Sequence, residues 1–407
     1  MRPATSISPL SGGGGARAAS TGSACPSVAH VVPRADGGLA RLRVPGGRID
    51  AAGLSVVAEA ATRFASGEVE ITNRGNLQLR GVRPSSEAAL SEALSAAGLS
   101  AGGPGDRRRN ILLGPLGGLE PGAEDLGPLL APLLAALDAE PRLDGLDEKF
   151  GFALEGGGSF TLAGRRAAVV ALPAREPGCM RLCWGWARDG EEGSVARPRQ
   201  VAREQLVEAL VDAALDSLGR ERAAVAVPPC GTTGPRPAGP LGIGEGFVGA
   251  MPVLGRTDAA GLEAIARAAE RFSGGLLRLT AWRGVVLPAP APGDRPRLLA
   301  ALARCGLVVD PADPASTVVA CVGARGCSSG LTDAAGDARR IIAARRAGGR
   351  PPTPLHLSGC ARCCADRYSI APSLVGSAPG CYELHEDGGP RAAAVSSAEA
   401  VELAAGM

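Results

Sequence analysis

Gly47-Arg48-Ile49-Asp50-Ala51-Ala52-Gly53-Leu54 occurs a second time in the chain, as Gly255-Arg256-Thr257-Asp258-Ala259-Ala260-Gly261-Leu262. The match continues without a gap, since residues 61–67 correspond to residues 269–275 at the same offset of 208. Each copy reads as a short strand, an aspartate that caps an amphipathic helix, a glycine, and a second strand with alternating apolar residues. Two such units predict an α+β fold whose core has a pseudo-two-fold axis.

A segment of different character follows each copy, so we expect the order repeat, insert, repeat, insert. Residues 1–24 are rich in Gly, Ser and Ala and lack the continuous apolar core of a signal peptide, which predicts a disordered leader. Apolar residues at helical spacing predict a helix within 201–218. The expected regions are the leader at 1–24, repeat one at 25–104, insert one at 105–240, repeat two at 241–314 and insert two at 315–407.

The composition is that of a soluble globular protein, with 45% hydrophobic and 21% charged residues. A net charge of +2 and an aromatic content of 3% argue against a nucleic-acid partner, because basic and base-stacking side chains are not in excess. No run of about twenty apolar residues appears, so we expect no membrane span. The 11 cysteines are an odd number in a chain without a secretory signal, which predicts a cytoplasmic protein with metal-bound or free thiols.

Four cysteines near the C-terminus form two close pairs. Cys321 and Cys327 are separated by five residues, and Cys360 and Cys364 by three. Four thiolates are the ligands of an iron–sulfur cluster. Zinc is an alternative, although structural zinc sites usually have two to four residues between paired ligands, and free buried cysteines are a second alternative.

The two repeats differ where a functional site is expected. Repeat one continues as Thr72-Asn73-Arg74-Gly75-Asn76-Leu77-Gln78, whereas repeat two has Trp282 at the position of Arg74 and Val286 at that of Gln78. One copy thus keeps polar side chains that the other has lost. This difference indicates one functional half and one structural half, unless Arg74 is only a solvated strand residue.

Further isolated cations lie between the repeats. Arg109 and Asn110 precede an apolar strand at 111–113, and Lys149 is the only lysine of the chain. A lysine retained among so many arginines suggests a specific role, because an ammonium can donate a proton and an arginine does so poorly. Cations that converge with Gln78 predict a site that binds an anion or polarises a substrate oxygen. Chance retention of Lys149 on the surface is the alternative.

These motifs, in this order, resemble those of the nitrite and sulfite reductase superfamily over about residues 25–385. Within it the chain is most similar to the precorrin-3B synthase family of aerobic cobalamin biosynthesis. The residues that carry the resemblance are Cys25-Pro26, the run Asn73-Arg74-Gly75-Asn76-Leu77-Gln78-Leu79-Arg80-Gly81-Val82, Arg109-Asn110, Glu148-Lys149-Phe150, the two cysteine pairs and His356-Leu357-Ser358-Gly359-Cys360.

The resemblance implies that the repeats are ferredoxin-like half domains and that each insert is an α/β domain of the type that binds iron–sulfur clusters and tetrapyrroles. It implies an oxidoreductase, a monooxygenase that uses O₂ and an external electron donor to hydroxylate C20 of precorrin-3A and to form a γ-lactone. Its cofactors are a [4Fe-4S] cluster and, as an option, a mononuclear non-haem iron.

The resemblance also assigns roles to residues. It implies metal ligation by Cys321, Cys327, Cys360 and Cys364, catalysis by Arg74, Arg109 and Lys149, and substrate binding by Arg74, Gln78, Arg109, Asn110 and Lys149. Cys363 competes with Cys364 as the fourth ligand, although the spacing favours Cys364. Gly151 stands where sulfite reductases have a second lysine, which disfavours reduction of a small dianion. The alternatives are a sirohaem-dependent sulfite or nitrite reductase and a non-catalytic Cys₄ metal or electron-transfer protein.

Overall fold

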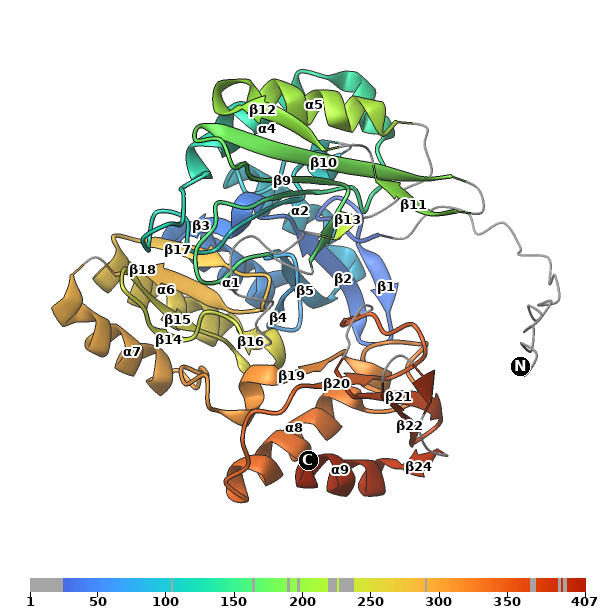
Figure 1. Ribbon diagram of the computed structural model, residues 1–407. Helices are drawn as coiled ribbons and strands as arrows, with labels where there is room; N and C mark the ends of the chain where they lie inside the picture. Colours follow the sequence, from blue (N-terminus) through green and yellow to red (C-terminus); the bar gives the residue numbers. More distant parts are fainter. Residues whose placement is uncertain are drawn as a thin grey trace, which may run out of the picture.

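The computed structural model describes residues 25–407 except 104, 163–164, 189–190, 196–197, 219–224, 227–237, 290, 367–370, 387–388 and 391–393. The expected leader at 1–24 therefore lies outside the described residues. The two repeats form the centre of the molecule, the first insert packs on one side of them, and the C-terminal insert packs on the other (Figure 1).

Both repeats have the same element order, as the duplicated sequence predicts. The helix of each repeat begins after the predicted aspartate: Asp50 accepts a hydrogen bond from Gly53 N at 2.7 Å, and Asp258 accepts one from Gly261 N at 2.8 Å. The elements of repeat one are β3 (Arg48–Asp50), α1 (Ala51–Phe64), β4 (Glu68–Ile71) and β5 (Leu77–Val82), and those of repeat two are β16 (Arg256–Asp258), α6 (Ala259–Ser273), β17 (Leu276–Leu279) and β18 (Val285–Pro288).

The repeats exchange a strand. One sheet has the order β1-β2-β5-β4-β16, with β1 (Val32–Arg34) and β2 (Gly37–Leu42), and the other has the order β14-β15-β18-β17-β3, with β14 (Gly242–Ile243) and β15 (Phe247–Ala250). Thus β16 of repeat two pairs with β4 of repeat one, and β3 of repeat one pairs with β17 of repeat two, both antiparallel. The α+β fold with a pseudo-two-fold core is confirmed, and the strand exchange is a feature that the repeat alone does not predict.

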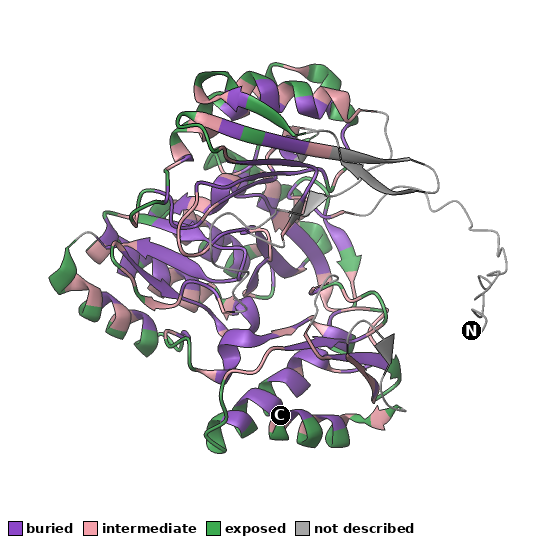
Figure 2. Cartoon of the chain, viewed as in Figure 1, coloured by how far each residue is buried: buried purple, intermediate pink, exposed green. Residues whose placement is uncertain are grey.

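The exchange depends on two glycines at which the backbones nearly touch. A Cβ atom on Gly47 would lie 2.1 Å from Leu279 O, and one on Gly255 would lie 3.0 Å from Ile71 O. Both glycines have positive φ angles, +67° and +71°, which other residues rarely adopt. The two repeats share one apolar core, in which Leu54 of α1 and Leu262 of α6 are fully buried. The strands at the centre of the molecule consist mostly of buried residues (Figure 2).

The inserts also share a topology. In the first, β6 (Ile111–Leu113), β7 (Phe152–Leu154) and β9 (Val169–Pro173) are parallel, and β10 (Cys179–Arg188) is antiparallel to β9. In the second, β19 (Val318–Ala320), β20 (Leu355–Ser358) and β21 (Ser373–Ala378) are parallel, and β22 (Cys381–Glu386) is antiparallel to β21. The duplication therefore extends to the inserts, where sequence similarity is no longer visible.

Helices cover these sheets. The first insert has α4 (Leu130–Asp138) and α5 (Leu206–Asp216), and the second has α8 (Ala334–Ala347) and α9 (Ser397–Gly406). The helix predicted within 201–218 begins only at Leu206, because residues 199–202 pair with β10. The remaining elements are α2 (Glu87–Ala96), α3 (Gly105–Arg108), β8 (Arg166–Ala167), β11 (Glu191–Val195), β12 (Arg199–Ala202), β13 (Val225–Ala226), α7 (Arg295–Arg304), β23 (Gly389–Pro390) and β24 (Val395–Ser396). No helix in the described ranges combines the length and apolar character that a membrane crossing needs.

Candidate active site and metal centre

The turn between β4 and β5 presents Arg74. The turn is closed by a hydrogen bond from Thr72 N to Asn76 O at 2.8 Å, and Asn76 Oδ1 accepts a second from Val44 N at 2.9 Å. Arg74 Nη1 donates to Lys149 O at 3.3 Å. Two residues that are 75 positions apart in sequence, and were predicted to act together, therefore lie side by side.

Asn110 joins the same turn to the Lys149 segment. Its side-chain oxygen accepts a hydrogen bond from Asn76 Nδ2 at 3.3 Å, and its amide nitrogen donates to Phe150 O at 2.8 Å. A Cβ atom on Gly151 would lie 2.4 Å from Asn110 Nδ2. A side chain at position 151 would therefore displace Asn110 from this packing.

Arg109 directly precedes Asn110, and Lys149 directly precedes Phe150, so both cations belong to the segments that these hydrogen bonds join. Lys149 is exposed in the turn before β7, and Arg109 is partly exposed. Arg43, which is buried, forms an ion pair with Asp106 at 2.6 Å. Burial raises the pKa of the Asp106 carboxyl, and the charges of Arg43 and Arg109 oppose that shift. The region therefore combines fixed cations with one exposed ammonium.

Gln78 lies in a different environment from the other predicted binding residues. Its Oε1 atom accepts two hydrogen bonds from Arg41, at 3.1 Å and 2.7 Å, and its Nε2 atom donates to Glu70 Oε2 at 2.9 Å. The side chain is 9% exposed. Only the second Nε2 hydrogen of Gln78 is left for a ligand that does not replace one of these hydrogen bonds.

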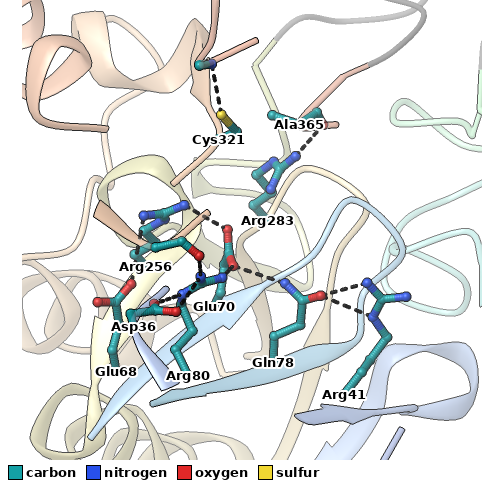
Figure 3. Close-up of polar contacts among 12 residues, drawn as sticks. Asp36, Arg41, Glu68, Glu70, Gln78, Arg80, Arg256, Arg283, Cys321 and Ala365 are labelled. Carbon is teal, nitrogen blue, oxygen red and sulfur yellow. Dashed lines mark hydrogen bonds and ion pairs between the residues drawn. The ribbon is translucent and has the colours of Figure 1, made fainter. Parts of the chain in front are cut away.

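The two cysteine loops follow neighbouring parallel strands, so they leave the sheet at the same edge. Cys321 comes directly after β19, and its N–H donates to Leu357 O of β20 at 3.1 Å. Gly359 N in turn donates to the Cys321 sulfur at 3.1 Å (Figure 3). These hydrogen bonds join the two cysteine loops without a metal ion.

Glycines allow the loops to approach closely. A Cβ atom on Gly359 would lie 2.9 Å from Gly323 Cα, and one on Gly330 would lie 2.6 Å from Ala324 N. Leu331 N donates to Gly359 O at 2.7 Å. A larger side chain at Gly359 would force the two cysteine loops apart, and one at Gly330 would disrupt the fold of the first loop.

The four predicted thiols interact electrostatically. Burial raises the pKa of the Cys364 thiol, and the charges of Cys360, Cys321 and Cys327 raise it further, while Arg362 opposes the shift. Although Cys364 is an exposed residue, its sulfur is partly enclosed. Within the described ranges no three His, Cys, Asp or Glu side chains converge as a finished metal site. The charges of Cys360, Cys321 and Cys327 nevertheless act on Cys364, so the four thiols lie in one region of the fold.

Cys363, which lies between the ligand candidates Cys360 and Cys364, has a positive φ angle of 46°.

His356, on β20, is 2% exposed, and its Nδ1 lies 3.4 Å from Ser373 Oγ. Burial lowers the pKa of His356 to about 4, with Asp366 opposing and Arg283 adding to the shift. The ring is therefore neutral at physiological pH.

A buried network of charged side chains connects the repeats to the cysteine loops (Figure 3). Glu70 is its centre: its Oε1 lies 3.1 Å from Arg256 Nη2, and its Oε2 lies 3.7 Å from Arg80 Nη1. Although burial opposes the charge, the neighbouring arginines hold the pKa of Glu70 below its ordinary value. The sequence assigned no role to Glu70, Arg80 or Arg283, although Arg80 lies in the run that carries the family resemblance. The available signal was the alignment of the repeats, which places Arg283 at the position of Gly75.

A cavity of about 580 Å³ lies elsewhere, between the repeats and α8, where Glu68, Arg256 and Arg339 line it. None of the predicted site residues is among its lining residues. The hydrogen bonds described above, rather than this cavity, define the candidate site.

Comparison with known proteins agrees with this architecture. The model of the nitrite/sulfite reductase ferredoxin-like half domain matches residues 32–97 and 243–305. A precorrin-3B synthase from Sinorhizobium sp is 28% identical, with 93% of this chain and 86% of that protein covered. A ferredoxin–nitrite reductase from Synechococcus elongatus is 26% identical, covering 83% of this chain and 76% of that protein.

Among solved structures, the NirA protein of Mycobacterium tuberculosis has the same fold, with a TM-score of 0.70 at 18% sequence identity. The similarity covers 90% of this chain and 79% of NirA. The chain thus contains the nitrite/sulfite reductase ferredoxin-like half domain twice, within a fold that it shares with NirA.

Proposed function

We propose that this protein is an oxygenase of the precorrin-3B synthase type, which hydroxylates C20 of precorrin-3A and forms a γ-lactone. The observation that carries the proposal is the similarity to a precorrin-3B synthase over 93% of the chain. Gly151 supports it, because the resemblance places the second lysine of sulfite reductases at this position, and a side chain here would collide with Asn110.

The cations beside the repeat-one turn suit a polycarboxylate substrate. Arg74 and Arg109 can bind acetate or propionate groups of a tetrapyrrole through paired N–H···O hydrogen bonds. Lys149, as an exposed ammonium next to Arg74, can orient oxygen or donate a proton to a developing alkoxide. Asn110 holds the two segments in register and so sets the position of both cations.

The thiols of Cys321, Cys327, Cys360 and Cys364 fit a [4Fe-4S] cluster by donor type and number. Such a cluster, when bound by these thiolates, would supply electrons one at a time. Insertion of one oxygen atom of O₂ into the substrate leaves the other to form water, which requires two electrons and two protons, so an external donor is part of the proposal. The hydroxyl oxygen comes from O₂, and the ring oxygen of the lactone comes from the acetate group.

A protein purified without oxygen tests the proposal. We expect an iron–sulfur shoulder without haem bands, equal amounts of iron and acid-labile sulfide, and conversion of precorrin-3A under ¹⁸O₂ to a product with one labelled oxygen atom. Zinc in place of iron, or no labelled product from a protein that carries the cluster, would contradict it.

A sirohaem-dependent nitrite or sulfite reductase is the second candidate. It is supported by the similarity to a ferredoxin–nitrite reductase over 83% of the chain. The same optical spectrum separates the two candidates, because a reductase should contain stoichiometric sirohaem and reduce nitrite or sulfite.

A further inference from the structure

Two arginines of the ferredoxin-like repeats reach the backbone beside two of the cysteines. Arg80, on β5 of repeat one, donates from Nη2 to Gly326 O at 2.9 Å, and Gly326 directly precedes Cys327. Arg283, in the β17–β18 turn of repeat two, donates from Nη2 to Ala365 O, and Ala365 directly follows Cys364 (Figure 3). Each cysteine pair is therefore held at one end by an arginine from a different repeat.

Both arginines are rigidly placed. Arg80 and Arg283 are 4% and 8% exposed. Arg80 makes two hydrogen bonds to Asp36, at 2.7 Å and 3.1 Å, and faces Glu70. Arg283 lies in the field of Glu70 and of the Cys321 thiol, and both oppose the lowering of its pKa by burial. These arginines keep their positive charge close to the cysteines in a region of low dielectric constant.

The backbone at Arg283 is under strain. Its φ angle is +61°, and the corresponding residue of repeat one is a glycine, Gly75, with φ +63°. The turn hydrogen bonds are also equivalent, since Gly75 N donates to Thr72 O and Arg283 N donates to Thr280 O. A glycine would fit this turn at lower cost. Among the described non-glycine residues only Leu254, Arg283 and Cys363 have positive φ, and the last two both lie at this junction. Strain of this kind commonly accompanies a functional constraint.

We propose that Arg283, together with Arg80, is a positioning residue for the metal centre. The two guanidinium groups hold the cysteine loops at the junction with the repeats and stabilise the negative charge of the ligated thiolates. Repeat two has thus exchanged a substrate-facing turn for a clamp on the cysteine loops. This inference rests on the cluster ligation that belongs to the proposed function.

The Arg283→Gly variant tests the proposal in the anaerobically prepared holoprotein, because glycine relieves the strain while removing the clamp. We expect iron to be lost to a chelator about 10-fold faster than from the wild type, as is typical when a residue that supports metal ligands is removed. We also expect a more negative midpoint potential, because a positive charge beside an anionic cluster favours its reduction.

Hydrogen–deuterium exchange of the iron-free protein provides a readout that needs no cluster. Backbone amides in 359–366 should exchange faster in Arg283→Gly than in the wild type. Arg297→Ala, which removes an exposed arginine from α7, is the matched control and should leave both iron loss and exchange unchanged. A wild type that binds no iron would refute the proposed function, and the exchange experiment would still decide whether the clamp exists.

Unchanged iron loss together with unchanged exchange in 359–366 would overturn the clamp. Should Arg283→Gly fail to fold, Arg283→Lys gives the answer, because it keeps the charge but cannot present the guanidinium fork. We expect Arg283→Lys to lose iron faster than the wild type while its midpoint potential stays nearly unchanged. A wild-type rate of iron loss together with a wild-type potential would show that a guanidinium group is not required.

Discussion

Lys149 is the side chain whose removal should separate activity from stability most cleanly. It is exposed, so replacement should change the free energy of unfolding by no more than about 0.5 kcal/mol. Under the proposed function, Lys149→Met removes a proton donor and should lower turnover of precorrin-3A by about 100-fold. Arg63→Ala, another exposed cation, is the control and should keep full activity. Near-normal turnover in Lys149→Met would remove this residue from the mechanism.

Glu155, directly after β7, should impose a pH dependence on stability. Its side chain is fully buried, and burial raises its pKa to about 7, although backbone N–H groups of Leu162, Gly157 and Gly156 oppose the shift. The folded protein therefore holds this proton more tightly than the unfolded chain, so the stabilisation is complete below about pH 4.5 and is lost as the pH rises through about 7.

The comparison of wild type with Glu155→Gln isolates this effect, because glutamine does not ionise. Relative to the variant, the wild type should lose on the order of 3 kcal/mol of unfolding free energy between about pH 4.5 and 7.5. Urea unfolding at small pH steps measures the difference, with the exposed Glu59→Gln as control. A difference that stays constant over this range would show that Glu155 titrates normally in the fold.

Some single residues of the site could be predicted from sequence and others could not. Arg74 and Lys149 stand out because the first differs between the repeats and the second is a unique residue type. Arg80 and Arg283 did not stand out, because their partners Gly326 and Ala365 are 246 and 82 residues away in sequence. Contacts of that kind are created by the packing of whole domains and leave no local pattern.

Removal of the N-cap aspartate from helix α1 or from helix α6 should destabilise the protein to the same extent. Asp50 and Asp258 are both exposed N-caps with matching hydrogen bonds to Gly53 and Gly261. Asp258→Ala and Asp50→Ala should each lower the free energy of unfolding by about 1 kcal/mol, whereas the asparagine variants should cost only a few tenths. Denaturant unfolding of the four variants provides the measurement. An alanine variant as stable as the wild type would mean that this helix end has another source of stabilisation.

The positions of individual helices and strands could be predicted from the sequence better than the pairing between strands. Helical periodicity and an aspartate cap located α1 and α6 correctly because these signals are local. The helix predicted within 201–218 began too early, since Val201 is an apolar residue that β12 uses to pair with β10. The exchange of β3 and β16 could not be foreseen, because each has only three residues and pairs with a strand of the other repeat.

The molecule as a whole is a duplication whose halves have diverged in chemistry. Gly114 N donates to Leu154 O at 3.0 Å in the first insert, as Cys321 N donates to Leu357 O at 3.1 Å in the second. Glu124 N likewise donates to Gly156 O, as Leu331 N does to Gly359 O. The loop that follows β6 in the first insert is thus equivalent to the cysteine loop that follows β19 in the second. Gly114 occupies the position of Cys321. The loop after β19 carries Cys321 and Cys327, whereas the equivalent loop after β6 contains no cysteine.

Because each central sheet contains a strand from the other repeat, neither half of the chain should fold alone. Fragments 1–240 and 241–407 would each lack a strand partner and would expose the buried faces of α1 or α6, including Leu54 and Leu262. We expect each fragment to aggregate or to lack a cooperative unfolding transition. Coexpressed fragments should instead form a 1:1 complex with the far-UV circular dichroism spectrum of the intact chain, as measured after size-exclusion chromatography. A fragment that unfolds cooperatively on its own would show that the exchanged strands are dispensable, and the pseudo-two-fold core would then be two domains in contact rather than one folding unit.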